Sequence, residues 1–92
     1  MRELTIEQYL IAQTEARGGL CIKHGNAGWP DRIVLLPRGR HGWAELKRPG
    51  GRERVLQLVR HKQLREAGAL VATIDSLAAV NRFLDQVELH RP

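Results

Sequence analysis

Three stretches of the chain repeat their apolar residues at the spacing of an amphipathic helix. They predict helices over residues 6–16, 55–67 and 77–87. Thr5 is the expected N-cap of the first helix, and Asp75 or Ser76 that of the third, because their side-chain oxygens can accept a free backbone N–H. Gly18 and Gly68 stand where the first two helices are expected to end.

Four shorter apolar stretches, rich in β-branched residues, predict strands. They cover residues 20–23, 33–36, 43–47 and 69–74. The second and fourth are continuously apolar, which is typical of strands covered on both faces. The third alternates polar and apolar side chains, and turn-forming Gly and Pro occupy the segments 24–30 and 37–42 between the strands.

The resulting order of elements is αβββαβα. Short turns join the first three strands and predict an antiparallel meander. A helix between the third and fourth strands predicts a parallel pair with a right-handed crossover. We therefore expect an α/β fold in which helices flank a small mixed β-sheet. A chain of 92 residues has room for one core, so we expect a single domain over residues 1–92.

The charge of the chain adds a candidate partner. Fifteen Lys and Arg against ten Asp and Glu give a net charge of +5 and a pI near 10.4. Most of these cations are arginines, whose planar guanidinium binds phosphate through two parallel hydrogen bonds. We expect a polyanionic partner, with nucleic acid first; the alternative is a surface of solvated arginines.

Cysteine usage and apolar content exclude two classes of protein. Cys21 is the only cysteine, so an internal disulfide cannot form, and we expect a small buried apolar residue there. No apolar run approaches the ~20 residues of a membrane span, and the first residues lack the apolar stretch of a signal peptide. We therefore expect a cytoplasmic protein without a membrane association.

Two carboxylates and an amine are expected to converge on one face of the sheet. Glu45 and Lys47 point to the same face of the strand 43–47, because side chains alternate along a strand. The antiparallel turn at residues 37–42 brings the start of the preceding strand, at Asp31, opposite the end of this one. Charged side chains are rarely buried without a partner, so this convergence calls for an explanation.

Close carboxylates need a proton or a cation between them, because like charges repel. Oxygen ligands without His or Cys suit Mg²⁺ or Mn²⁺, and the backbone carbonyl of Leu46 could supply another oxygen. Such a metal polarises a phosphodiester and lowers the pKa of a bound water, while Lys47 can orient that water or stabilise developing negative charge. The alternatives are structural: Asp31 as a turn residue, and Glu45 with Lys47 as an exposed ion pair.

Pro30-Asp31 followed by Glu45-Leu46-Lys47 resembles the signature of the PD-(D/E)XK nucleases. A wider string, from about Thr5 to Leu84, resembles the VRR-NUC family within that superfamily. It comprises Glu7 on the first helix, Gly28-Trp29-Pro30-Asp31-Arg32-Ile33-Val34-Leu35-Leu36, Glu45-Leu46-Lys47, Gln57 on the following helix and Gly68 at its end. The helical Glu and Gln, in the right order, add specificity to the short motif.

This resemblance implies a restriction-endonuclease-like core and a metal-dependent DNA endonuclease. It implies that Asp31 and Glu45 bind Mg²⁺ or Mn²⁺, helped by Glu7 directly or through a water molecule. It also implies that Lys47 is the catalytic lysine and that Gln57 is a polar partner near the metal or the scissile phosphate. As an alternative, Glu7 is a first-turn acid that interacts with the helix dipole.

Among members of the family, this chain resembles the stand-alone, single-domain proteins of phages and bacteria. These proteins dimerise and cut branched DNA, notably four-way (Holliday) junctions. We therefore expect a homodimer that acts on branched DNA in a bacterial or phage-infected cell. The loop 24–29 is shorter than in many members, and Trp29 stands where an aliphatic residue is more usual; both departures bear on substrate preference. The alternatives are a nuclease of flaps, nicks or single strands, a non-catalytic nucleic-acid-binding module, and an interaction subunit.

Several cations and one aromatic residue are candidate DNA contacts. The cations of the glycine-rich segment after Lys47, which we expect to bind phosphate, are Arg48, Arg52 and Arg54. Lys23 either binds phosphate or is solvated, and Trp29 either stacks on an unpaired base or anchors its loop. We expect His61 at the surface or at the edge of the core rather than as a proton carrier.

Overall fold

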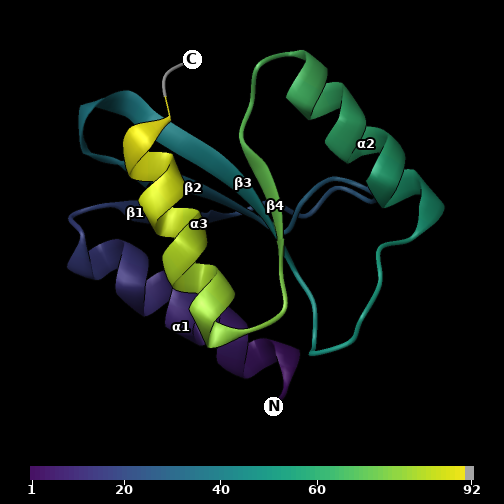
Figure 1. Cartoon of the computed structure of the whole chain (residues 1–92), viewed down its shortest axis with the longest axis horizontal. Coiled ribbons are helices and arrows are strands. Elements are labelled where there is room, and N and C mark those ends of the chain that lie inside the picture. The colour runs from purple at the N-terminus through teal and green to yellow at the C-terminus, as the bar shows by residue number, and fades with distance from the viewer. Residues whose placement is uncertain (91–92) are drawn as a thin grey trace.

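A four-stranded sheet flanked by helices forms the fold of residues 1–90, which are the residues that the computed structural model describes (Figure 1). In chain order the elements are α1 (Glu3–Ala16), β1 (Leu20–Lys23), β2 (Arg32–Leu36), the short 3₁₀ helix η1 (Pro37–Gly39), β3 (Arg40–Leu46), α2 (Val55–Glu66), β4 (Val71–Ile74) and α3 (Leu77–Leu89). The predicted order αβββαβα is confirmed. Within residues 1–90, no helix combines the length and the apolar character that crossing a membrane requires.

The strands lie in the order β1-β2-β3-β4, as the connections between them predict. β1, β2 and β3 form an antiparallel meander, and β4 runs parallel to β3 after the crossover that contains α2. The register places Arg32 opposite Ala44 and Glu45 opposite Thr73. Asp31, one residue before β2, therefore continues this register toward Glu45.

The helices α1 and α3 contact each other and cover one face of the sheet (Figure 1). Their apolar side chains and those of the strands form a buried core of Ile6, Leu10, Val34, Leu36, Ala44, Leu46, Ile74, Val80, Phe83, Leu84 and Val87. Because Ala44 and Leu46 point into this core, alternation along β3 sends Glu45 and Lys47 to the opposite face. That face is the one on which α2 lies, since Gln57 of α2 hydrogen-bonds to Glu45.

The close approach of α3 to β3 explains a glycine in the middle of that strand. A Cβ atom on Gly42 would lie 2.8 Å from Cγ2 of Val87 and 2.9 Å from Cζ of Phe83. Both neighbours are fully buried and have no free space to move into. Glycine in a strand interior commonly marks such a close contact.

The helix starts agree with the sequence in one case and differ in the other. Ser76 caps α3, because its Oγ accepts the N–H of Ala79 at 3.0 Å. The prediction of Thr5 as the N-cap of α1 is wrong: that helix begins at Glu3, with Arg2 as N-cap. The N–H of Thr5 already bonds to the Arg2 carbonyl at 3.1 Å, so Thr5 lies inside the first turn.

Two strand starts also differ from the sequence prediction. β3 begins at Arg40, earlier than predicted, because η1 compresses the reversal after β2 into a few residues. Arg38 and Gly39 make this tight turn with left-handed φ values of 71° and 74°. β4 begins at Val71, later than predicted, because the N–H of Ala69 still bonds to a carbonyl of α2.

Candidate active site

An open cavity of about 540 Å³ lies where the ends of β2 and β3 meet α2 and the loop 24–30. Its lining consists of Glu3, Lys23, residues 24–29, Asp31, Glu45, Leu46, Lys47, Arg54, Leu56 and Gln57. Acidic and basic side chains thus share one hollow, which offers ligands for both a cation and an anion.

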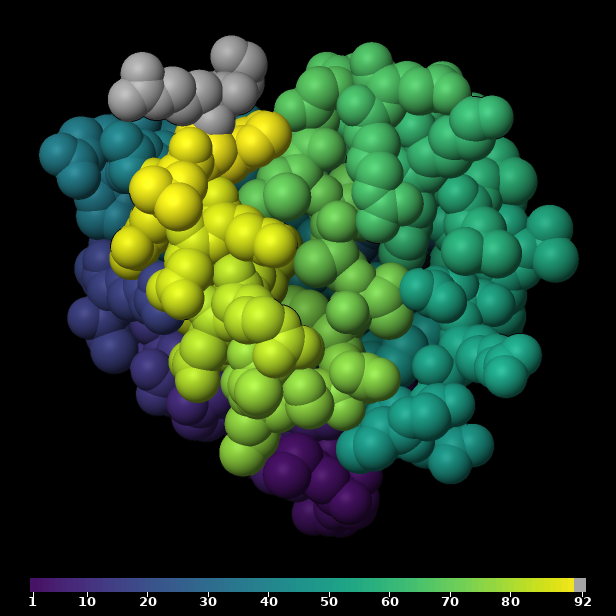
Figure 2. Space-filling view, in the orientation of Figure 1, coloured from purple at the N-terminus to yellow at the C-terminus, as the bar shows by residue number. Residues whose placement is uncertain are grey.

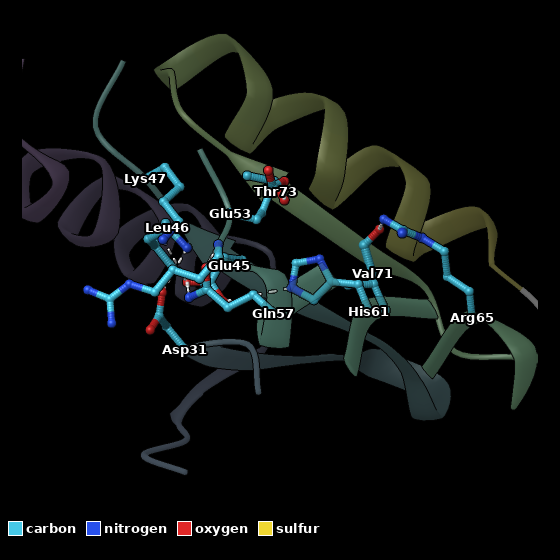
Figure 3. A network of polar contacts seen from close by, with 11 residues as sticks. Asp31, Glu45, Leu46, Lys47, Glu53, Gln57, His61, Arg65, Val71 and Thr73 are labelled. Atoms are coloured by element: carbon cyan, nitrogen blue, oxygen red, sulfur yellow. Dashed lines mark hydrogen bonds and ion pairs between the residues drawn. The ribbon is translucent and has the colours of Figure 1, made fainter. Parts of the chain in front are cut away.

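Asp31 is held against the end of β3 by a backbone hydrogen bond. Its Oδ2 accepts the N–H of Leu46 at 2.9 Å, so its carboxylate lies beside Glu45 (Figure 3). The antiparallel register of β2 and β3 produces this placement, because Asp31 comes just before the pair Arg32 and Ala44. The structure therefore brings together the two acids of the sequence motif.

Glu45 is buried, with only 2% of its surface exposed. Burial, followed by the hydrogen bond and the charge of Asp31, raises the pKa of Glu45 to about 8; Lys47 opposes this rise. Without a bound cation, Glu45 is therefore mostly protonated at neutral pH. A buried carboxyl of this kind is poised to exchange its proton for a metal ion.

Gln57 and Lys47 contact the same oxygen of Glu45. The Gln57 amide nitrogen donates to Glu45 Oε2 at 3.2 Å, and Lys47 Nζ lies 3.9 Å from that oxygen. Gln57 Oε1 accepts the backbone N–H of Arg54 at 2.8 Å, at the start of α2. The helix start thus fixes the Gln57 amide so that its nitrogen points at Glu45.

The other oxygen of Glu45 faces His61. The distance from Oε1 to His61 Nε2 is 3.8 Å, and neither buried atom has a hydrogen-bond partner within residues 1–90. Burial and the charge of Arg65 lower the pKa of His61, so its ring is neutral at pH 7. Of the two places expected for His61, the surface is wrong, because the residue is only 1% exposed; its ring lies between α2 and the sheet, beside the apolar core.

Glu7 is not among the residues that line the cavity. Its Oε2 pairs with Arg32 Nε at 2.9 Å. Arg32 shares the face of Ala44, on the side of α1, whereas Glu45 points to the opposite face. The acid of α1 that does line the cavity is Glu3, one turn earlier.

The candidate DNA contacts divide between the cavity and its surroundings. Lys23, Trp29 and Arg54 line the cavity, whereas Arg48 and Arg52 lie on the exposed loop between β3 and α2. Of the two interpretations of Trp29, the contacts favour loop anchoring. The guanidinium carbon of an α2 arginine, at position 60, lies 4.9 Å from the centre of its ring.

Three residues near the site were not predicted from the sequence: Thr73, Glu53 and Glu3. Thr73, opposite Glu45 in the sheet, donates a hydrogen bond from Oγ1 to Glu53 Oε1. This bond is the largest cause that lowers the pKa of Glu53. Two features of the sequence could have indicated the pair: Thr73 is a polar residue in an apolar strand, and Glu53 is an acid in a basic loop. Glu3 has no motif around it that would have indicated its place.

The donor set at Asp31 and Glu45 fits a hard divalent cation. Two carboxylates in contact, one of them buried with a raised pKa, are what a bound Mg²⁺ or Mn²⁺ would stabilise, and the Leu46 carbonyl is a neighbouring oxygen. Among the described residues, no group of three or more His, Cys, Asp and Glu side chains is arranged as a metal site. A magnesium ion usually keeps several waters, so two carboxylates are sufficient protein ligands.

Comparison with known proteins gives the family. No family model matches the sequence. The chain is 37% identical over 79 residues to a protein described as "Putative nuclease p44" from Acyrthosiphon pisum secondary endosymbiont phage 1; the match covers 83% of this chain and 85% of that protein. A solved structure described as a VRR_NUC domain matches with a TM-score of 0.82 and 30% identity, over 92% of this chain and 97% of the other. The chain belongs to the VRR-NUC family, as its motifs predict, and shares its α/β fold.

Proposed function

We propose that this protein is a metal-dependent endodeoxyribonuclease that hydrolyses phosphodiester bonds. The observation that carries the proposal is the contact of Asp31 with a buried Glu45 beside Lys47 in an open cavity. Carboxylates that repel each other in a buried place destabilise the fold unless they bind something. The relative from the phage is described as a nuclease, which supports the same activity here.

The residues of the site divide the work of phosphodiester hydrolysis. Asp31, Glu45 and the Leu46 carbonyl would hold Mg²⁺ or Mn²⁺. When bound, this ion supplies charge neutralisation at the phosphate and lowers the pKa of a water molecule. The Lys47 ammonium positions the attacking water or stabilises the negative charge that develops on the phosphate. Gln57 keeps the Glu45 carboxylate in place through its hydrogen bond to Oε2.

The acids of α1 take supporting roles in this proposal. Glu7 is held by Arg32, the neighbour of Asp31 along the chain, so it orients this part of the strand from the opposite face of the sheet. Glu3 lines the cavity and adds negative charge near Glu45. A second metal position would draw on Glu3 before Glu7.

The DNA substrate would be bound mainly through its phosphates. Lys23 and Arg54 line the cavity, and Arg48 and Arg52 extend the positive charge along the exposed loop. Four-way junctions and other branched DNA are the substrates that we propose, with flaps, nicks and single strands as the second candidates. The family resemblance, rather than any base-reading element, supports this choice.

A homodimer is part of the proposal, because a protomer of this size covers little of a branched substrate. The outer side of α2 exposes apolar side chains: Val55 is 79% exposed, Leu58 52% and Val59 44%. Figure 2 shows α2 and the preceding loop forming one side of the molecule, with no other part of residues 1–90 in front of them. A second copy packed there would bury this apolar surface and place two cavities near each other.

A cleavage assay tests the function. Labelled linear, flapped, nicked and four-way DNAs are incubated with Mn²⁺, with Mg²⁺ and with EDTA, using the parent protein, Lys47→Ala and the control Arg82→Ala. Arg82 is an exposed arginine of α3 outside the cavity and away from the apolar side of α2. We expect cleavage only with a metal, lost in Lys47→Ala although DNA binding is retained, and unchanged in Arg82→Ala. DNA binding without any cleavage by the parent protein would instead establish a non-catalytic binding module.

A further inference from the structure

His61 and Glu45 form a buried pair that the roles assigned so far do not use. His61 lies in the middle of α2 and is 1% exposed, and its Nε2 is 3.8 Å from Glu45 Oε1 (Figure 3). Both atoms lack a hydrogen-bond partner in the part of the chain that the structure describes. Buried polar atoms without partners are uncommon, because each loses its hydrogen bonds to water. Two such atoms that face each other indicate a contact that forms in a working state of the site.

The two oxygens of Glu45 have different neighbours. Oε2 accepts a hydrogen bond from Gln57 and lies near Lys47, whereas Oε1 points toward α2 and His61. The terminal torsion of a glutamate has a broad energy minimum, so a carboxylate that is bonded through one oxygen alone can rotate. A donor at Oε1 would therefore decide which way the carboxylate faces.

Two other polar groups near His61 have hydrogen bonds of their own. Arg65, one turn further along α2, donates to the carbonyl of Val71 at 3.2 Å. Glu53 accepts a hydrogen bond from Thr73 on β4. These bonds leave Glu45 Oε1 as the acceptor that faces the imidazole (Figure 3).

We propose that His61 is a positioning residue for Glu45: the Nε2–H of its imidazole donates to Oε1 and holds the carboxylate in the orientation in which it binds the metal. The inference rests on the proposed function, because it treats Glu45 as a metal ligand. An ionised carboxylate only accepts hydrogen bonds, so a proton on Nε2 satisfies both unpartnered atoms at once. Closing the gap from 3.8 Å to hydrogen-bond length requires a movement of about 1 Å.

Variants at position 61 test the inference through metal affinity, measured by Mn²⁺ titration of the full chain without DNA. Gln places its amide nitrogen near the position of Nε2, whereas Asn places it near Nδ1. We expect His61→Gln to keep the parent affinity within about threefold, and His61→Asn and His61→Leu to lose about 10–100-fold. His41→Leu, on β3 away from the cavity, is the matched control and should leave the affinity unchanged.

A Glu45→Gln background separates the two proposals. If Glu45→Gln leaves Mn²⁺ affinity unchanged, Glu45 is not a ligand and both proposals fail. If Glu45→Gln lowers the affinity but His61→Asn does not, only the role of His61 is overturned. We expect a third result: Glu45→Gln lowers the affinity, and adding His61→Asn to it causes little further loss, because the two residues act through one contact.

The tautomer of His61 can be measured in the parent protein, so this test does not depend on whether a variant folds. In the Mg²⁺-loaded parent protein, nitrogen NMR of the imidazole should show a neutral ring with its proton on Nε2, protected from exchange with water. A proton on Nδ1 in that state would overturn the inference, because Nε2 could then only accept a hydrogen bond and the ionised Glu45 could not donate one.

Discussion

Asp31 and Leu46 are joined by a hydrogen bond across the cavity end of the sheet, from the Leu46 N–H to Asp31 Oδ2 at 2.9 Å. The bond fixes the Asp31 side chain to the backbone of β3, one residue after Glu45. The contact between the two carboxylates therefore follows from the register of β2 and β3 rather than from a free choice of side-chain conformation. The fold itself creates the repulsion that a bound cation relieves.

Replacing Asp31 by Asn separates the stability of the site from its activity. Asn keeps an acceptor for the Leu46 N–H but removes the charge beside Glu45. We expect cleavage to fall about 100-fold or more. In EDTA at about pH 9, where Glu45 is ionised, the free energy of unfolding should rise by about 1 kcal/mol, which corresponds to about 4–8 °C in Tm.

The control for this substitution is Asp31→Ala, which loses the acceptor as well as the charge. We expect Asp31→Ala to be less stable than Asp31→Asn when both are unfolded in urea with EDTA, because the Leu46 N–H then has no partner. Equal stability of the two variants would contradict the importance of this hydrogen bond.

The raised pKa of Glu45 predicts a pH dependence of stability in the metal-free protein. The folded pKa, about 8, lies above the ordinary value of 4.5, so between these values the folded state binds more protons than the unfolded state. Stability should therefore fall as pH rises from about 5 to about 8, by up to a few kcal/mol. Saturating Mg²⁺ should remove most of this fall, because it takes the place of the proton.

Urea unfolding at a series of pH values, with EDTA and with Mg²⁺, measures this effect. Glu45→Gln should flatten the curve in EDTA, because the titrating group is gone. A parent curve that rises over the same pH range would contradict the raised pKa of Glu45.

The fold was accessible from the sequence because its signals are local. The continuous apolar runs and the short turns of the meander predict the order and direction of the strands. The boundaries at Thr5 and Arg40 could not be predicted, because they depend on which backbone N–H and carbonyl groups pair. Nothing in the letters around Thr5 signals that the Arg2 carbonyl closes the first turn of α1.

The site was only partly accessible for the same reason. Asp31, Glu45 and Lys47 are tied together by the register of two neighbouring strands, so a turn and an alternation suffice to place them. His61 belongs to a helix whose rotation relative to the sheet no local pattern defines. Glu7 shows a different limit: its position matches the family motif, but the motif does not predict that its carboxylate pairs with Arg32.

Gly42 is a test of the packing between β3 and α3. A methyl group there would meet Phe83 and Val87 at less than 3 Å, so we expect Gly42→Ala to destabilise the fold by about 1–3 kcal/mol. Gly25→Ala is the control, because a Cβ at Gly25 has no atom within 4 Å and its φ is not left-handed. Thermal unfolding of both variants measures the difference, and equal Tm values would show that α3 moves away at little cost.

Salt dependence tests the phosphate contacts of the basic loop. If Arg52 binds a DNA phosphate, Arg52→Ala should reduce the slope of log K against log salt by about 0.9, the release of one counterion. Arg82→Ala, an exposed arginine on α3, should leave the slope unchanged. Fluorescence anisotropy of a labelled four-way DNA in EDTA measures binding without cleavage. A slope that changes equally in both variants would assign the effect to net charge instead.

The apolar side of α2 predicts a specific effect on assembly. A Glu in place of the half-exposed Leu58 would put a charge at the centre of the packed surface and remove its hydrating water. The dissociation constant of the dimer should therefore rise at least about tenfold. Leu89→Glu, on the 80% exposed end of α3, removes a comparable apolar side chain outside this surface and should leave the dimer intact. Sedimentation velocity of both variants and the parent protein, over a range of concentrations, measures the dissociation constant.

Since Leu58 is not among the residues that line the cavity, a monomeric Leu58→Glu should keep its metal affinity while it loses paired cuts on four-way DNA. A parent protein that stays monomeric at all concentrations would instead leave the exposed side of α2 as a surface for some other partner and contradict the dimer.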